Sequence, residues 1–289
     1  YVQSLPKRPL GNSPDNARRL SLAGAQDKTS VTLLNGKMLL PRAGTPSTHI
    51  LKTPIQHIDY SVLNEFLCMS TAKRLGLHVS ACAMYPLKET KVLLVQRYDR
   101  ILKSKTVKRL HQEDFCQALA VLSKNKYQAE GGPNFATVFK LLFITDNPVK
   151  ARLELARRVM FNFLIGNNDA HAKNSSLLYK DIKPVLAPAY DLLSTAVYPE
   201  LTTKMAMYIG SSKEAEWVNA KDWQLFCQET NLSFAWFKKE FIKLAHALPD
   251  QIQTTILHSN LTKEESVWAK KLLDLCAKNS KELIHRLEL

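Results

Sequence analysis

The feature that most limits what this chain can be is residues 166–174, which read Gly-Asn-Asn-Asp-Ala-His-Ala-Lys-Asn. This stretch combines a carboxylate, an imidazole, an ammonium and three carboxamides. Apolar residues at helical spacing precede it over about residues 149–165, and its first glycine can supply a left-handed helix cap. Two short runs follow, residues 175–179 and 184–186, which predict a small hairpin leading to Asp191. The order is therefore helix, polar loop, hairpin and a second acid.

That order suits phosphoryl transfer. One aspartate can accept the proton of an attacking hydroxyl, while an asparagine and a second aspartate supply the oxygen ligands that Mg²⁺ prefers. The pattern assigns the base to Asp169 and the metal ligands to Asn174 and Asp191. An isolated Asp and Asn at this spacing are more often turn formers or helix caps. The neighbouring segments must decide between the two interpretations.

Residues 165–174, together with Tyr190 and Asp191, resemble the catalytic and metal-binding segments of HipA-family serine/threonine kinases. These kinases are the toxins of bacterial toxin–antitoxin systems. Three further segments match the family in the same order, at residues 21–29, 49–52 and 112–117. The resemblance covers roughly residues 19–195, and five collinear segments make a chance match improbable.

The resemblance implies an α+β, two-lobed fold like that of protein kinases. A small β-rich N-lobe would occupy residues 1–100 and carry the phosphate loop and the ATP-binding lysine. A larger helical C-lobe would occupy residues 101–289 and carry the catalytic and metal-binding loops. The implied cofactors are ATP and Mg²⁺.

The family's functional positions transfer residue by residue onto this sequence. Asp169 becomes the catalytic base, Asn174 and Asp191 become the metal ligands, and Glu65 becomes the ion-pair partner of Lys52. The expected ATP-binding residues are Ala23, Gly24, Ala25, Gln26, Asp27, Lys28, Lys52, Gln96, Arg97, Tyr98, His171, Lys173, Asn174, Tyr190 and Asp191.

Local patterns in the first hundred residues agree with a β-rich lobe. A small-residue turn at 23–28 interrupts a strand pattern that resumes over residues 29–34, as in a lid over phosphates, although it lacks the repeated glycines of the best-known phosphate loops. Without the resemblance to the family, residues 23–28 predict only the turn of a hairpin. Strands are predicted at 48–52 and 91–100, and a helix at 60–75.

The predicted strand at 91–100 leads out of the first lobe, toward the segment that joins the lobes. Gln96, Arg97 and Tyr98 match positions where kinases hold adenine, mainly through the main chain. Arg97-Tyr98-Asp99-Arg100 fits a surface salt-bridge turn equally well. From Arg109 onward the chain is predicted to be mainly helical, with Asp114 near a helix N-terminus. Residues 262–265 are predicted to form a capping box at the start of a later helix.

Ser21 corresponds to the loop serine that HipA kinases phosphorylate on themselves. A phosphate adds a charge of about −1.5 to −2, so it would be drawn from a loop meant to hold ATP phosphates toward arginines. We therefore expect phosphorylation of Ser21 to disorder that loop and to weaken nucleotide binding.

Composition limits the setting. No stretch approaches the ~18 consecutive apolar residues of a membrane span, and the N-terminus does not read as a signal peptide. The five cysteines are scattered singly, which favours reduced, buried thiols in a bacterial cytoplasm. Trp217, Trp223 and Trp236 lie in amphipathic surroundings and are predicted to be core residues.

The formal net charge of +14 favours acidic partners, although no aromatic-interleaved basic motif appears. By resemblance the substrate is a bacterial protein, with an aminoacyl-tRNA synthetase, free or tRNA-bound, as the leading class. Only about twenty residues precede the phosphate loop, which resembles the short HipT-like form lacking the N-terminal subdomain. A HipB-like DNA-binding antitoxin and a HipS-like small protein are then implied as partners.

Two other classes of function remain open on the sequence alone. A small-molecule phosphotransferase could use the same machinery on a metabolite. A basic regulatory module could act in a DNA-bound antitoxin complex with its kinase site incidental. A metal-dependent nuclease is weaker, because it leaves the phosphate-loop segment and Lys52 unexplained.

Overall fold

The computed structural model describes residues 26–34, 36–41, 46–87, 90–103 and 106–288. Its strands are β1 (Lys28–Leu34), β2 (Lys37–Leu39), β3 (His49–Lys52), β4 (Cys82–Leu87), β5 (Thr90–Gln96), β6 (Arg100–Lys103), β7 (Thr106–Arg109), β8 (His111–Asp114), β9 (Ser176–Tyr179), β10 (Val185–Leu186), β11 (Lys204–Ile209) and β12 (Ser212–Glu214). Its α-helices are α2 (Ser61–Arg74), α3 (Phe115–Ala118), α4 (Phe135–Leu141), α5 (Pro148–Leu164), α6 (Ala220–Glu229), α7 (Phe234–Leu257) and α8 (Lys263–Glu288).

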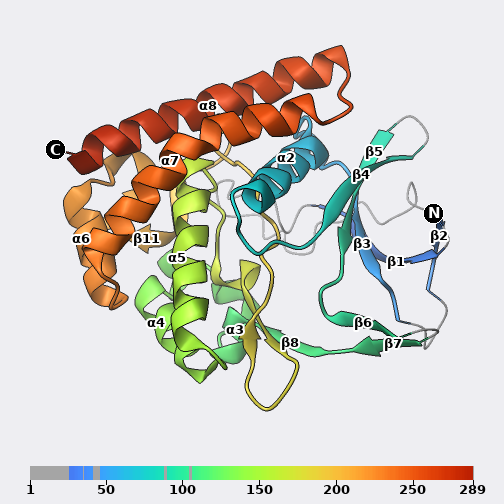
Figure 1. The fold of residues 1–289 in the computed structure, drawn as a ribbon, viewed down its shortest axis with the longest axis horizontal. Coiled ribbons are helices and arrows are strands. Elements are labelled where there is room, and N and C mark those ends of the chain that lie inside the picture. The colour runs from blue at the N-terminus through green and yellow to red at the C-terminus, as the bar shows by residue number, and fades with distance from the viewer. Residues whose placement is uncertain (1–25, 35, 42–45, 88–89, 104–105, 289) are drawn as a thin grey trace.

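The first part of the described chain forms a five-stranded antiparallel sheet in the order β2-β1-β3-β5-β4. Helix α2 connects β3 to β4 and packs on one face of this sheet, between the sheet and the long helices α7 and α8 (Figure 1). A small apolar cluster of Val31, Leu51, Val92 and Leu94 lies apart from the main core. Alternation along β3 and β5 thus supplies apolar side chains to both faces of the sheet.

The remainder is mainly helical, and α5 runs through its centre (Figure 1). Helices α7 and α8 pack side by side and reach back over α2, so that one continuous apolar core joins α2 to α5, α6, α7 and α8. A three-stranded sheet, β10-β9-β8, and the hairpin of β6 and β7 lie below the first sheet in this view. The expected β-rich small lobe and helical large lobe are confirmed.

Several local predictions hold. Helix α5 ends at Leu164, and Gly166 beyond it has φ +66°, the left-handed conformation that glycine adopts readily. Thr262 and Glu265 form the reciprocal hydrogen bonds of a capping box at the start of α8 (3.2 and 2.8 Å). Each of the five cysteines is a free thiol, and four of them are buried.

Two predictions need correction. The chain does not become helical at Arg109, because Arg109 ends β7 and His111–Asp114 pair with β9 as strand β8; Asp114 caps the short helix α3 through a capping box, as predicted. Trp217 is 57% exposed and is not a core residue. Its helical surroundings end at a 3₁₀ turn, Ala215–Trp217, which leaves the indole on the surface before α6 begins.

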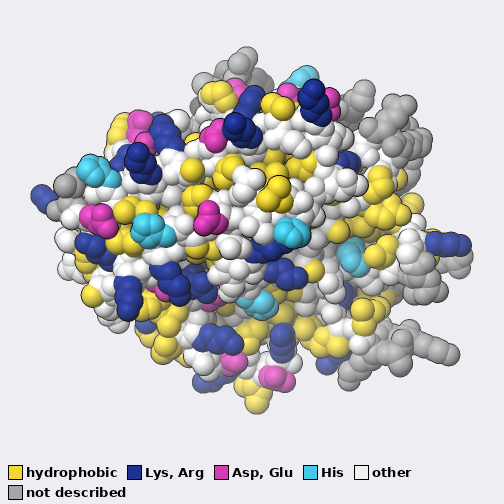
Figure 2. Space-filling model, turned by 45° about the horizontal axis from the view of Figure 1, so that its top comes forward, with side chains coloured by type: hydrophobic (Ala, Val, Ile, Leu, Met, Phe, Trp, Pro, Cys, Tyr) yellow, Lys and Arg dark blue, Asp and Glu magenta, His cyan; other side chains and the backbone are white. Residues whose placement is uncertain are grey.

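Basic side chains do not gather into one patch on the face shown in Figure 2. Lys and Arg are distributed across it and are interspersed with Asp and Glu. In the described part of the chain, no helix is both long enough and apolar enough to cross a membrane.

The two tryptophans that flank the start of α6 should differ sharply in their effect on stability. Trp223 is 1% exposed and contacts the rings of Phe163, Phe237 and Phe241, so Trp223→Ala should lower the free energy of unfolding by about 3–5 kcal/mol. Trp217→Ala is the matched control and should change it by about 0.5 kcal/mol or less. Chemical denaturation of both variants would check this, and equal losses would contradict the packing described here.

Candidate functional site

The start of the polar stretch 166–174 is hydrogen-bonded to the chain that follows Asp191. The backbone amides of Thr195 and Ala196 both donate to the carbonyl oxygen of Gly166 (3.0 and 2.9 Å). A Cβ at Gly166 would lie 2.7 Å from the Cβ of Ala196, so a glycine is required there by space as well as by φ. The stretch therefore leaves α5 in a direction set by the segment that also carries Asp191.

Inside the stretch, Asp169 and Asn174 are linked through the backbone. The Asn174 side-chain amide donates to the carbonyl oxygen of Asp169 (3.1 Å), and the Asp169 amide donates to the side-chain oxygen of Asn167 (3.2 Å). Because its Nδ2 is directed at Asp169, the Oδ1 of Asn174 points the other way. A 3₁₀ turn, Ala172–Asn174, closes the loop before β9 begins.

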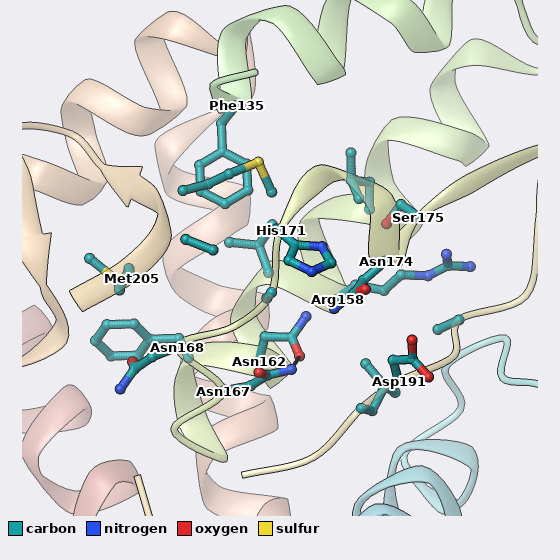
Figure 3. A pocket seen from close by; sticks show the side chains of 18 of the residues that line it. Phe135, Arg158, Asn162, Asn167, Asn168, His171, Asn174, Ser175, Asp191 and Met205 are labelled. Atoms are coloured by element: carbon teal, nitrogen blue, oxygen red, sulfur yellow. Dashed lines mark hydrogen bonds between the residues drawn. The ribbon is translucent and has the colours of Figure 1, made fainter. Parts of the chain in front are cut away.

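Asn174 and Asp191 line one cavity of about 60 Å³. The ring of His171 lies near its middle, with Phe135 and Met205 toward one end and Asp191 at the other (Figure 3). The two expected metal ligands therefore share a site, although they are separated in sequence by the hairpin of β9 and β10.

Lys52 reaches this site from the small lobe. Its ammonium donates to the Glu65 carboxylate at 2.5 Å and also to the carboxylate of Asp191. Glu65 lies on α2, so the expected ion pair between Lys52 and Glu65 is present. The contact with Asp191 was not expected from the sequence. One ammonium thus connects β3, α2 and the segment that carries Asp191.

Burial and charge act in opposite directions on these three groups. Burial disfavours the ammonium of Lys52, but the carboxylates of Asp191 and Glu65 raise its pKa above the ordinary lysine value. Burial raises the pKa of Glu65 despite the attraction of Lys52. For Asp191 burial is outweighed by the positive charges of Lys52 and Lys28, which lower its pKa. The ionised form of Asp191 is therefore the better stabilised of the two carboxylates.

The position of Asp191 is set by α2 and by its own backbone. Asn64, next to Glu65 on α2, is fully buried and pairs with the backbone of Ser194 in both directions (2.7 and 2.9 Å). Asp191 itself has φ +54°, which is unusual for a residue with a side chain. A backbone bridge between Val79 and Ala189 fixes the chain just before it.

His171 is buried and neutral. Burial, reinforced by the charge of Lys126, lowers the pKa of His171 to about 3. Neither ring nitrogen has a hydrogen-bond partner among the described residues, and the ring packs edge-on against Tyr127 with centroids 5.5 Å apart. A neutral imidazole facing the cavity can accept or donate one hydrogen bond to a ligand there.

The joint between the lobes is held by its main chain. The amides of Gln96 and Arg97 donate to the carbonyl oxygens of Ala81 and Thr48 (2.8 and 3.0 Å), so neither amide is available to adenine. The Arg97 guanidinium makes a two-point contact with Asp99 (3.0 and 2.8 Å), which Arg100 also contacts. The salt-bridge turn considered from the sequence is thus present, and Asp99 is buried rather than on the surface.

Tyr98 and Tyr190 stack at the joint with centroids 5.9 Å apart. The Tyr98 hydroxyl donates to Gln112, and the Tyr190 hydroxyl donates to the carbonyl oxygen of Lys173 (2.8 Å). The Lys173 ammonium is directed at the Ser123 hydroxyl (2.5 Å). These expected ATP-binding side chains are therefore engaged in contacts with the protein itself, and a role in nucleotide binding stays a prediction.

Only part of the predicted phosphate loop lies within the residues that the structure describes. Ser21, Ala23, Gly24 and Ala25 lie outside the described residues. The other three residues of the predicted loop are described. The side chain of Gln26 donates to the carbonyl oxygen of Thr53 (2.9 Å), and the carbonyl oxygen of Asp27 accepts from the Thr53 amide (3.1 Å). Lys28 lies opposite Lys52 in the pairing of β1 with β3. Directly opposed residues in an antiparallel pair project from the same face of the sheet, so both lysines project from one face of the sheet.

Two residues of the site were missed from the sequence. Asn64 reads as an ordinary polar residue on a helix, and only the fold shows that it binds the segment after Asp191. Tyr127 lies in what reads as a loop before Gly131 and Gly132, yet its hydroxyl donates to Oδ1 of Asp169 (2.8 Å). The two adjacent glycines were the available signal that this loop is tightly shaped.

The buried neutral His171 should make stability fall in acid. The unfolded chain has a histidine pKa near 6.5, so between about pH 6.5 and pH 3 the unfolded state binds more protons than the folded state. The contribution of His171 is fully present above pH 6.5 and is lost as the pH falls, by up to about 1.4 kcal/mol per pH unit. His171→Gln should remove this slope relative to the wild type in denaturation curves at pH 7, 6 and 5. The prediction would be contradicted if the free energy of unfolding changed with pH to the same extent in both proteins.

Comparison with known proteins agrees with this arrangement. Residues 20–256 match the family model described as the HipA-like C-terminal domain. The Sinorhizobium fredii protein Y4mE, whose kinase assignment is provisional, is 40% identical over 253 residues, 87% of this chain and 60% of its own length. The serine/threonine-protein kinase toxin HipA of Shewanella oneidensis is 32% identical over 257 residues, 84% of this chain and 59% of its own. The chain thus spans about three-fifths of the length of these relatives.

Solved structures agree as well. The Shewanella oneidensis HipA complex with HipB and operator DNA superposes with a TM-score of 0.88 at 28% identity, over 95% of this chain and 67% of that chain. The Helicobacter pylori proinflammatory kinase CtkA superposes with a TM-score of 0.59 at 14% identity, over 89% and 91% of the two chains, which speaks for the fold alone. Because the family model covers residues 20–256, more than four-fifths of the sequence, the chain belongs to the HipA-like C-terminal domain family.

Proposed function

We propose that this chain is an ATP-dependent serine/threonine protein kinase of the HipA/HipT type. The observation that carries the proposal is the meeting of Lys52, Glu65 and Asp191 beside the cavity that Asn174 and Asp191 line. A lysine from the sheet, its partner on the adjacent helix and a metal-binding aspartate from the second lobe are the recurring parts of a kinase nucleotide site. Family membership supports the same conclusion.

The residues present suit a magnesium-bound nucleotide. Mg²⁺ is commonly held by one or two protein oxygens together with substrate phosphates, and Asp191 with the Oδ1 of Asn174 supplies such a pair. The described residues hold no cluster of three or more His, Cys, Asp and Glu side chains that would form a complete protein cage. Bound there, the ion would neutralise charge developing on the transferred phosphoryl group.

The remaining residues would orient the nucleotide and the acceptor. Lys52 would contact the α- and β-phosphates, held in place by Glu65. In this structure the Lys52 ammonium pairs with Asp191. When a nucleotide binds, the ammonium would share its contacts between that carboxylate and the phosphates. Asp169 would accept the proton of the acceptor hydroxyl as the oxygen attacks the γ-phosphate.

We place the substrate among bacterial proteins, with an aminoacyl-tRNA synthetase as the leading class and inhibition of translation as the outcome. The net charge of +14 supports an acidic or nucleic-acid-bound target. A HipB-like DNA-binding antitoxin is the favoured partner, because the matched Shewanella structure is a complex of HipA with HipB and operator DNA. A HipS-like small protein, action in the cytoplasm and a boundary between lobes near residue 100 stay predictions.

Loss of the base should abolish transfer while leaving the fold intact. Incubation of Asp169→Asn with Mg²⁺ and γ-labelled ATP should give at least about a hundredfold less protein-bound label than the wild type, since positioned bases contribute about 10²–10⁴-fold. Asp181→Asn, an exposed aspartate in the turn between β9 and β10, is the matched control and should label normally. Equal labelling of Asp169→Asn and wild type would overturn the assignment of the base.

The same assay on a bacterial lysate separates the alternatives, because label on metabolites without any protein acceptor would favour a small-molecule phosphotransferase.

Self-phosphorylation should depend on Ser21 and should weaken nucleotide binding. Ser21→Ala should lose self-labelling yet keep transfer to a protein in the lysate. Calorimetric titration with an ATP analogue should show weaker affinity for the phosphorylated wild type than for Ser21→Ala, because the added negative charge repels the nucleotide phosphates. Unchanged affinity would remove the regulatory role proposed for Ser21.

A further inference from the structure

The loop at residues 122–134 packs against the catalytic stretch and is tightly shaped by its two glycines. Gly131 has φ +79°, and the amide of Gly132 donates to the carbonyl oxygen of Tyr127 (2.9 Å). A Cβ on Gly132 would lie 2.3 Å from the carbonyl oxygen of Asn125 and 2.6 Å from that of Tyr127. These are backbone atoms, which have little room to move, so this close approach of the loop backbone around Tyr127 requires a glycine at position 132.

The side chain of Tyr127 is directed at the catalytic stretch. Its hydroxyl donates to Oδ1 of Asp169 at 2.8 Å in a partly buried contact. Its ring packs edge-on against His171 at an interplanar angle of 72°, and the Lys126 ammonium lies 5.0 Å from the ring centroid. The ring is therefore confined on two sides, which fixes the direction of the hydroxyl.

Two further contacts anchor the loop at its flanks. The Lys173 ammonium donates to the Ser123 hydroxyl (2.5 Å), which ties the start of the loop to the catalytic stretch. The side-chain oxygen of Gln128 accepts from the backbone amide of Tyr208 on β11 (2.8 Å). The loop thus connects the catalytic stretch with β11, and Tyr127 lies between these two anchors.

We propose that Tyr127 is a positioning residue for the catalytic base, an inference that rests on the proposed kinase function. A hydrogen bond to one oxygen fixes the plane of the Asp169 carboxylate and hence the direction in which its other oxygen points. A base must lie within hydrogen-bond reach of the proton it accepts, and a poorly oriented carboxylate spends much of its time outside that geometry. Tyr127 therefore acts through Asp169 on the acceptor step and has no part in holding ATP.

Removing only the hydroxyl tests this role. Tyr127→Phe keeps the ring against His171 but removes the hydrogen bond. The rate of self-labelling with Mg²⁺ and γ-labelled ATP should fall about 10- to 100-fold at saturating ATP, the range that losing a hydrogen bond to a charged group produces. The ATP concentration for half-maximal rate and the affinity for an ATP analogue should stay within about twofold of wild type. Tyr179→Phe, which removes a hydroxyl bonded to Glu113 away from the site, is the matched control and should label normally.

A double-mutant comparison separates positioning from general support. If Tyr127 acts through Asp169, then adding Tyr127→Phe to Asp169→Asn should cause no further loss of the residual rate. A full additional loss would overturn the proposal, as would a Tyr127→Phe variant that binds the ATP analogue poorly, because the residue would then support the fold of the site.

The other outcomes are equally decisive. A Tyr127→Phe variant that labels at the wild-type rate shows that the hydrogen bond is dispensable. A Tyr127→Phe variant that labels faster than wild type overturns the positioning role, because the Tyr127 hydroxyl would then occupy the oxygen of Asp169 that the acceptor hydroxyl needs. Absence of labelling in the wild type as well overturns the kinase function, and this inference falls with it.

Discussion

The Lys52 ammonium lies out of solvent between the carboxylates of Glu65 and Asp191, and the rest of the site is arranged around that contact. A buried lysine is stable in its charged form only if it is paired, and here two carboxylates from separate elements pair with it. Loss of Lys52 would leave two buried carboxylates close together without a counter-charge. The interaction thus holds the sheet, α2 and the segment of Asp191 in one relative position.

Helix α2 makes this arrangement possible because it contributes two adjacent side chains to it. Glu65 faces Lys52, and Asn64 binds the backbone of Ser194 just beyond Asp191. The same helix packs against α7, and its apolar residues belong to the core that runs on through α5 and α8. A small shift of α2 would therefore change the ion pair and the position of the Asp191 segment together.

Much of the architecture could be predicted from local patterns. The helix before residue 166, the left-handed glycine at its end, the capping box before α8 and the strands at β3 and β5 follow from periodicity and from the conformational preferences of single residues. The errors arose where a short segment had no periodicity of its own. The chain was expected to be mainly helical from Arg109, yet pairing with β9 makes residues 111–114 a strand. Trp217 was placed in the core although a 3₁₀ turn leaves it exposed.

The sequence by itself determined which chemical groups the site contains and their order along the chain, because an Asp and an Asn five residues apart with a later Asp are local facts. Tertiary structure alone decided that Lys52 contacts Asp191, 139 residues away, and that Tyr127 donates to Asp169, 42 residues away. Such contacts depend on how α2 and the loop at 122–134 pack against distant segments. That packing is set by the whole core, and no spacing between neighbouring residues records it.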